Sequence, residues 1–480
     1  MLTRRPGMVW SPTEWYDLLF ESETKTWEDG MRAKSGSLYT AVRKFWRSAA
    51  AVGAALVLLG SATWAQGQAS GDPPALRLIN TIPINGTAGN RATRMFSFDI
   101  SFVDPTTGLF FLADRSNAAL DVIDTKTDTL FGQIGGAAFG FAGDTGTTAT
   151  SGPNGVATGA PTLPNCIFAT DGPSRVVSIN SSVSFVQPVS SVNTGGQFRA
   201  DELAFDPADR LILAINNADT PAFGTLINVS SNCGLSIKTK IVFTGGVPAT
   251  NGAEQPVWVG GSTQRFFVSI PEVSGPGNGT GPTGAVAQIN INGVAEKTYL
   301  INFCQPAGLT VGPNGDLLVG CNSVFDSSGN KCSAVVPSPN PPGTPAGAPA
   351  TCTGIGFPQS AICNPGKGCT GNSLVSVPGV GGGDEVWFNS GDGNYYVTAG
   401  NDPVGPAFGV IASVSNVLTQ LVPTLPPVPA TAPPTPPGHS AGTVHSIAAS
   451  AANNHVYVPL PANTSYPNCV QGCIAVFSAQ

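Results

Sequence analysis

Short apolar runs recur along the chain and are separated by turn-forming Asn, Asp and Gly residues. Residues 109–112, 211–215 and 456–458 are examples, and they are rich in β-branched and aromatic side chains. Alternation of apolar and polar positions together with this enrichment is typical of strands rather than helices. The pattern therefore predicts an all-β chain of many short strands.

One segment of this pattern occurs twice in nearly the same letters. Residues 201–206 read Asp-Glu-Leu-Ala-Phe-Asp and residues 384–389 read Asp-Glu-Val-Trp-Phe-Asn. Each is followed by an apolar run and then by Pro-Ala-Phe-Gly, at residues 221–224 and 406–409. Such a repeat indicates a copied supersecondary unit and favours a radial or stacked β architecture.

Seven starts of this unit can be placed, at a period of roughly 50 to 60 residues. Each has one or two polar residues, which we call the lead-in residues, ahead of a first strand. The starts are residues 99–102, 153–156, 201–204, 254–257, 305–308, 384–387 and 445–448.

The clearest unit covers residues 109–136, with a first strand, an Asn turn, a Val-Ile-Asp-Thr strand and a glycine exit. In these residues the chain resembles the YVTN-repeat β-propellers. The starts around Gly155, Gly308 and His445 also look like those of related extracellular propellers, including gluconolactonase-like ones. The resemblance implies four-stranded blades around an axial channel, and it implies no single activity because this fold carries binders and enzymes alike.

We therefore expect one β-propeller domain over residues 66–480, with seven four-stranded blades and with six or eight as alternatives. The last blade supplies strands at residues 446–449, 456–460 and 474–477 only. Residues 76–84 have the strand pattern to provide the missing fourth. An N-terminal strand that closes the C-terminal blade removes an open sheet edge.

Residues 1–65 have the features of a leader. Arg43, Lys44 and Arg47 precede the apolar residues 48–60, and small residues follow up to Ala65. This order predicts a secretory signal peptide with a true start at Met31, and hence a secreted or periplasmic protein without a transmembrane segment after signal removal. The alternative is an uncleaved anchor, for which the apolar stretch is shorter than the roughly 20 residues of a spanning helix.

All ten cysteines follow this leader. An even number in an exported chain predicts disulfides, and Cys469 with Cys473 and Cys363 with Cys369 are the expected local pairs. No Cys-x-x-Cys occurs, which argues against a zinc ribbon or a thioredoxin-like site.

Charge and composition limit the classes of molecule that this chain is expected to bind. The net charge is −7 and only 11% of residues are charged. The chain therefore lacks the basic surface that binding of a phosphate backbone requires, and we expect no nucleic-acid partner. We expect a monomer that binds a protein, a glycan or a small molecule. The proline-rich residues 335–350 and 422–438 are expected to be exposed loops.

In a propeller the lead-in residues of the innermost strands gather at one mouth of the channel. Carboxylates that converge there repel one another unless a cation neutralises them, so a divalent ion such as calcium is one expectation. The alternative is that each side chain caps a turn or bonds a neighbouring blade. The candidate ring consists of Asp99, Asp201, Glu202, Gln255, Gln305, Asp384 and Glu385.

His445 occupies a lead-in position where other units have acids, so it could serve as a general base or a ligand. Two functions stay open. The first is a non-catalytic binding or scaffold module that uses the channel mouth and loops. The second is a metal-dependent hydrolase of lactonase type, in which His445, Asp201 and Asp384 would be catalytic.

Overall fold

In the computed structural model the chain divides after Gly71, and Asp72–Gln480 forms one compact unit. The structure describes residues 75–183, 185–243, 248–273, 275–332, 359–399, 406–424, 438–439 and 443–479, all in this unit. The expected leader, residues 1–65 with Met31, and the proline-rich residues 335–350 lie outside these ranges. Of residues 422–438, only 422–424 and 438 lie inside them.

The described residues are almost entirely strands and turns. Strand β1 (Leu76–Pro83) comes first in the chain but belongs to the last sheet. The first sheets contain β2 (Ser101–Asp104), β3 (Leu109–Asp114), β4 (Ala119–Asp124), β5 (Thr129–Gly135), β6 (Val156–Gly159), β7 (Leu163–Asp171), β8 (Arg175–Asn180) and β9 (Ser190–Asn193). The middle ones contain β10 (Leu203–Asp206), β11 (Leu211–Asn216), β12 (Phe223–Val229), β13 (Leu235–Val242), β14 (Pro256–Val259), β15 (Arg265–Ile270), β16 (Thr283–Ile289) and β17 (Ala295–Asn302). The last ones contain β18 (Cys304–Val311), β19 (Leu317–Val324), β20 (Gln359–Cys363), β21 (Leu374–Pro378), β22 (Val386–Asn389), β23 (Asn394–Ala399), β24 (Ala407–Ala412), β25 (Val417–Pro423), β26 (Ala448–Ala449), β27 (Val456–Leu460) and β28 (Cys473–Ala479). Short 3-10 turns occur at η1 (Thr148–Thr150), η2 (Pro313–Gly315), η3 (Pro365–Lys367) and η4 (Gly371–Ser373).

These strands build antiparallel four-stranded sheets that are compatible with propeller blades. Five such sheets in the described ranges have the orders β1-β28-β27-β26, β2-β3-β4-β5, β6-β7-β8-β9, β10-β11-β12-β13 and β22-β23-β24-β25. Strands β14 to β17 and β18 to β21 make two further groups of four, joined by one parallel pair between Thr283 and Cys304. Every expected start of the repeated unit lies immediately before, or at, the first strand of one of these groups.

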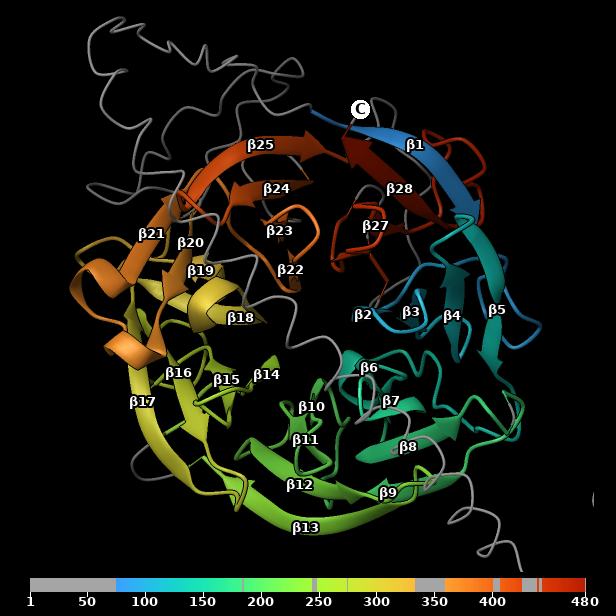
Figure 1. Cartoon of the computed structure of the whole chain (residues 1–480), viewed down its shortest axis with the longest axis horizontal. Helices are drawn as coiled ribbons and strands as arrows, with labels where there is room; N and C mark the ends of the chain where they lie inside the picture. Colours follow the sequence, from blue (N-terminus) through green and yellow to red (C-terminus); the bar gives the residue numbers. More distant parts are fainter. Residues whose placement is uncertain are drawn as a thin grey trace, which may run out of the picture. The chain divides into compact units, whose positions relative to one another are not determined.

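The sheets follow one another around a common centre in chain order (Figure 1). The first strand of each group lies toward this centre and contacts the first strand of the next group, from β2 through β6, β10, β14, β18 and β22 to β26. Strand β26 in turn contacts β2. The polar lead-ins of all these strands are thereby brought near one another.

The expected N-terminal strand is confirmed. Strand β1 pairs antiparallel with β28, from Leu76 opposite Ala479 to Pro83 opposite Cys473. It also packs against the next sheet, because Ile82 belongs to a buried cluster that contains Phe110 and Leu112 of β3. The first and last strands of the described unit therefore share one sheet.

Neighbouring sheets pack face to face through strands that are buried on both sides. All of β11 is buried. Because side chains alternate along a strand, Leu211, Leu213 and Ile215 join a cluster with β15, whereas Ile212 joins a cluster with β7 on the opposite face. The second strand of this sheet is therefore apolar along nearly its whole length, because both of its faces pack against neighbouring sheets.

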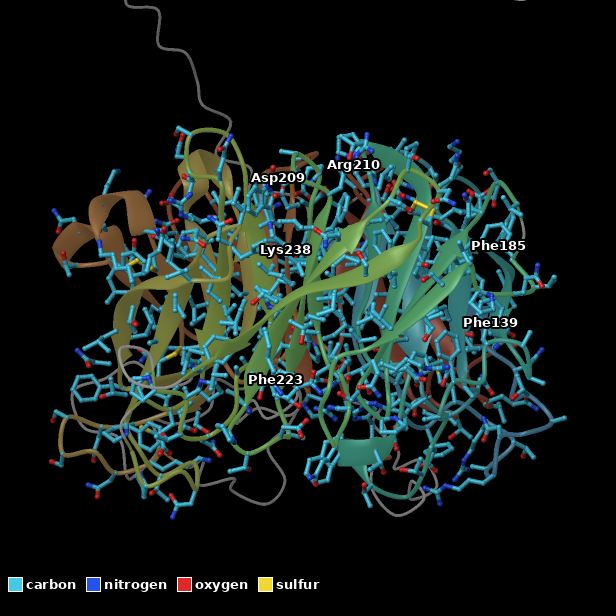
Figure 2. All side chains as sticks on the ribbon, turned by 90° about the horizontal axis from the view of Figure 1, so that it is seen from below. Phe139, Phe185, Asp209, Arg210, Phe223 and Lys238 are labelled. Carbon is cyan, nitrogen blue, oxygen red and sulfur yellow. A yellow bond between two sulfur atoms is a disulfide. The ribbon has the colours of Figure 1, made fainter. Side chains whose placement is uncertain are left out.

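The turn after the first strand is set by the last residue of that strand. Asp104 Oδ1 accepts hydrogen bonds from the backbone N–H groups of Thr106 and Thr107, and Asp206 Oδ1 accepts from those of Ala208 and Asp209. These are Asx turns, which Asp and Asn favour because their short side chain can mimic a backbone turn. The turn holding Asp209 and Arg210 lies at one face of the unit, while Phe223 at the start of β12 lies toward the opposite face (Figure 2).

Four disulfides are formed within the described residues: Cys166–Cys233, Cys304–Cys321, Cys363–Cys369 and Cys469–Cys473. The two local pairs expected from the sequence are among them. No helix in the described part of the chain is long and apolar enough to span a membrane.

Candidate functional site

A polar cavity of about 460 Å³ lies where the lead-ins of the first strands converge. Its acidic lining consists of Asp99, Asp201, Glu202, Glu254 and Asp384. Its basic lining consists of Arg115 and Arg199, together with the imidazoles of His439 and His445. So many ionisable groups in one cavity require a defined pattern of pairing, since burial penalises every isolated charge.

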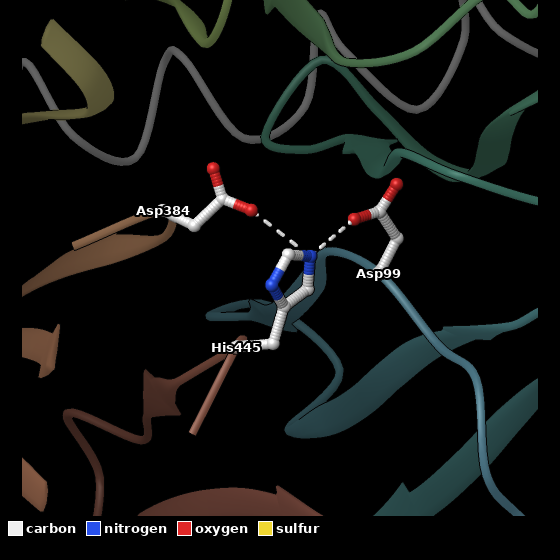
Figure 3. A group of neighbouring side chains, drawn as sticks. All are labelled: Asp99, Asp384 and His445. Carbon is white, nitrogen blue, oxygen red and sulfur yellow. Dashed lines mark hydrogen bonds and ion pairs between the residues drawn. The ribbon is translucent and has the colours of Figure 1, made fainter. Parts of the chain in front are cut away.

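His445 is bound by two carboxylates from different sheets. Its Nε2 atom lies 2.7 Å from Oδ1 of Asp99 and 3.0 Å from Oδ2 of Asp384, so that one nitrogen faces both acids (Figure 3). Asp99 precedes β2, Asp384 precedes β22 and His445 precedes β26. One ligand atom from each of the three lies within 4.8 Å of the others, an arrangement that could hold a metal ion.

Asp384 is the most accessible member of this cluster, with 31% of its side chain exposed. Burial acts to raise the pKa of Asp384, but the neighbouring His445 and the guanidinium groups of Arg199 and Arg115 outweigh it and hold that pKa below its ordinary value. Asp384 is therefore a carboxylate anion at neutral pH.

Arg115 lies behind Asp99. Its guanidinium pairs with Asp99 Oδ2, and its Nε donates a hydrogen bond of 2.8 Å to Asn154 Oδ1. Burial and the nearby Arg199 lower the pKa of Arg115 to about 9, which still leaves it charged at neutral pH. Because Arg115 uses Asp99 Oδ2, the other oxygen of Asp99 is the one directed at His445.

Arg199 and Asp201 form the second buried ion pair. Arg199 Nε lies 2.7 Å from Asp201 Oδ1, and its NH2 donates to Asp201 Oδ2 at 2.7 Å. Burial lowers the pKa of Arg199, but Asp201 and Glu254 more than compensate and the net direction is upward. This two-point pairing fixes the geometry of both side chains.

Two glutamates in the cavity resist ionisation. Glu202 is 4% exposed and its Oε2 has no hydrogen-bond partner among the described residues. Burial, followed by the charges of Asp201 and Glu254, raises the pKa of Glu202 well above its ordinary value. Burial and the charges of Asp201 and Asp384 raise the pKa of Glu254 to about 8, although Asn217 donates to it at 3.2 Å. At neutral pH Glu254 can therefore donate a proton in a hydrogen bond, and the pKa of Glu202 is shifted in the same direction.

His439 lies beside His445, with ring centroids 4.5 Å apart. Burial, then the proximity of His445, lowers the pKa of His439 to about 3, so this imidazole is neutral at physiological pH. Its Nε2 lies 2.8 Å from the carbonyl oxygen of Phe98, which a neutral ring satisfies by donating.

The structure brings together only part of the seven-residue ring expected from the sequence. Asp99, Asp201, Glu202 and Asp384 line the cavity. Gln255 instead accepts a hydrogen bond from the Leu309 backbone N–H, and Gln305 donates to the carbonyl oxygen of Gly281 at 2.9 Å. These two amides join neighbouring segments of backbone, which is the alternative role considered for the lead-in residues.

Glu385 also takes a structural position. It is 1% exposed and accepts hydrogen bonds from the backbone and hydroxyl groups of Ser101, from the Ser446 hydroxyl and from the Ile447 N–H. These donors belong to β2 and to the lead-in of β26, so one carboxyl group connects three first strands. Burial raises the pKa of Glu385 to about 8 even though these donors act in the opposite direction.

Sequence reasoning did not select Arg115, Arg199, Glu254 or His439 as site residues. Arg115 lies in the turn after β3 and Arg199 shortly before β10, so neither is at a lead-in position of the repeat. The low fraction of charged residues could have pointed to Arg199 as a site residue. With only 11% of residues charged, an arginine two positions before the Asp201-Glu202 pair is conspicuous.

No protein-family model and no curated protein matches this chain. Solved structures do match. One is the hydrazine synthase of Kuenenia stuttgartiensis, a propeller-containing protein, with a TM-score of 0.53 and 11% sequence identity over 82% of this chain and 96% of that one. The likeness is one of fold. It agrees with the β-propeller-like sheets described above, while the YVTN-repeat resemblance stays a prediction.

Proposed function

We propose that the described unit is a single seven-bladed β-propeller and that it acts as a ligand-binding module through the cavity at its centre. The cyclic contacts from β2 to β26 and back to β2 favour seven blades over six or eight. The disulfides favour an oxidising compartment, and hence secretion or a periplasmic location.

The observation that carries the binding proposal is the pre-organised polarity of the cavity. Its two arginines are already paired with Asp99 and Asp201, which leaves the ionised Asp384 and the protonatable Glu202 and Glu254 without a guanidinium of their own. Such a lining repels anions and offers both hydrogen-bond donors and acceptors. The ligand class that fits is a small hydroxyl- or amine-bearing molecule, a sugar or glycan end included.

Titration calorimetry tests this function, with a panel of mono- and disaccharides, polyols and small amines set against carboxylates and phosphates. We expect binding by members of the first group only. Glu254→Ala should weaken that binding about tenfold, the equivalent of about 1.4 kcal/mol, because it removes one direct hydrogen-bonding group. Asp128→Asn, outside the cavity, is the control and should bind normally. Binding confined to the anions, or equal binding by the Glu254→Ala variant, would contradict the proposal.

A second candidate, a metal-dependent hydrolase of lactonase type, is favoured by one observation. Asp99, Asp384 and His445 present three potential metal ligands at the cavity wall. Hydrolysis of γ- and δ-lactones, measured with and without added divalent ions, separates the two functions. Metal-stimulated turnover that is lost in His445→Gln would favour the enzyme, whereas sugar or amine binding without turnover favours the binding module.

A further inference from the structure

Three side chains from three sheets meet at a single point of the cavity wall. His445 Nε2 lies 2.7 Å from one oxygen of Asp99 and 3.0 Å from one oxygen of Asp384. Metal–ligand bonds of about 2.0 to 2.2 Å place adjacent ligand atoms about 3 to 3.5 Å apart, depending on the coordination geometry, so these atoms need only a small outward shift to surround an ion.

Both aspartates of this group are already oriented by the surrounding protein. Arg115 holds Asp99 through its other oxygen, so Oδ1 remains directed at His445. The backbone N–H of Asp384 donates to the Thr398 hydroxyl at 3.1 Å, and this contact fixes the lead-in that carries its carboxylate. Outer partners of this kind orient metal ligands in known metal sites.

A separate observation points to an occupant of the same cavity. Glu202 is 4% exposed, lines the cavity, and has a carboxyl oxygen, Oε2, with no hydrogen-bond partner among the described residues. An unsatisfied buried carboxyl oxygen is costly. A water molecule or ligand held in the cavity by an ion would supply the missing partner.

We propose that Asp99, Asp384 and His445 bind one divalent transition-metal ion, of which Zn²⁺ is the representative, with its remaining coordination positions open to the cavity. The proposal rests on the proposed function, because it makes this ion part of the ligand-binding cavity. The ion is of the transition series because an imidazole nitrogen suits Zn²⁺ and its neighbours, whereas calcium takes six to eight oxygen ligands. The open positions distinguish it from a closed structural zinc site.

Direct metal binding tests the proposal on the full chain with its disulfides formed. The protein is stripped with EDTA, dialysed and titrated with Zn²⁺ by calorimetry, and its metal content is measured by mass spectrometry. We expect one ion per chain, a visible d–d spectrum after Co²⁺ replacement, and no displacement by calcium. His445→Gln and Asp384→Asn should each weaken Zn²⁺ binding by at least about tenfold.

His455 provides the matched control. Its Nδ1 lies 2.9 Å from Asp128 Oδ2, so it is also a histidine paired with an aspartate, but it does not line the cavity. His455→Gln should keep wild-type zinc affinity. Circular dichroism and thermal denaturation identify any variant that fails to fold, and if His445→Gln is such a variant, Asp384→Asn decides.

Three outcomes would overturn the metal site: no stoichiometric zinc in the wild type, equal loss of zinc in His455→Gln, or preference for calcium. Sugar and amine binding is measured on the EDTA-treated protein in parallel. If that binding persists without any metal binding, the metal proposal fails while the binding module stands. If zinc binds and no small molecule does, the module fails instead.

Discussion

Glu385 offers the sharpest test of how the first strands are held together. Glu385→Ala removes the acceptor for two backbone N–H groups, those of Ser101 and Ile447, at 3.1 and 2.9 Å. It also removes the acceptor for the hydroxyl groups of Ser101 and Ser446. The hydroxyls can rotate to other partners, whereas the buried N–H groups cannot.

A buried donor left unsatisfied costs about 1 to 3 kcal/mol, so the two N–H groups together predict a loss of about 4 kcal/mol in the free energy of unfolding. Relief of the burial penalty that raises the pKa of Glu385 reduces this loss in part. Even so, the variant should rank among the more destabilising single substitutions.

The copied sequence supplies the control. Glu202 occupies the same place in the other copy of the repeat, and its Oε2 has no hydrogen-bond partner among the described residues. Glu202→Ala should therefore change stability by less than about 1 kcal/mol, or increase it, because no comparable set of donors is lost. The repeat thus allows the same substitution to be compared with and without its partners.

Urea denaturation followed by tryptophan fluorescence measures both variants. Trp387 is a suitable reporter because its ring packs edge-on against Phe102, with centroids 5.4 Å apart, between two of the strands that Glu385 joins. Equal destabilisation by the two substitutions, or a smaller effect of Glu385→Ala, would refute the assignment of Glu385 as the connection between first strands.

Three further predictions concern the rest of the fold. Burial raises the pKa of Asp114 from 3.8 to about 6 and that of Asp121 well above its ordinary value. The free energy of unfolding of the wild type should therefore fall as pH rises from about 4 to above 6, by about 3 kcal/mol for Asp114 alone. Asp121→Asn should flatten this dependence in denaturation curves taken across that range, and an unchanged slope would contradict it. Replacing Cys166 and Cys233 by serine removes a disulfide between residues separated by 67 positions. The free energy of unfolding, measured by urea denaturation, should fall by about 4 kcal/mol, and a loss below about 1 kcal/mol would contradict this prediction. Deleting residues 75–84 should expose β28 as a free edge and produce aggregates in size-exclusion chromatography, whereas a stable monomer would show that β1 is dispensable.

The sheets could be predicted from the sequence because the same order of polar lead-in, apolar strand and Asp or Asn turn recurs at similar spacing. An apolar second strand and an Asp or Asn at the end of the first strand are local requirements, met separately by residues such as Asp104 and Asp206. The pairing of residues 76–84 with the last sheet was also predictable, since the C-terminal unit was one strand short.

The membership of the site was harder to predict because neighbouring lead-in residues point in different directions. Asp384 faces the cavity, whereas the next residue, Glu385, is turned into the contact between first strands. In the other copy of the repeat, Asp201 and Glu202 both line the cavity. The same Asp-Glu pair at two lead-ins therefore does not determine which side chain faces the cavity. The hydrogen-bond donors near each glutamate determine its direction.

The pairing of β1 with β28 sets the order in which the unit can be completed. Strand β1 can pair only after β28, at the other end of the described unit, has been synthesised, so this sheet depends on a contact of very large sequence separation. Contacts of such large sequence separation are slow to form. The hairpins within the other sheets join residues that are close in sequence, so we expect them to form before the sheet that contains β1 and β28. The lead-in of β26, which carries His445, belongs to that later sheet.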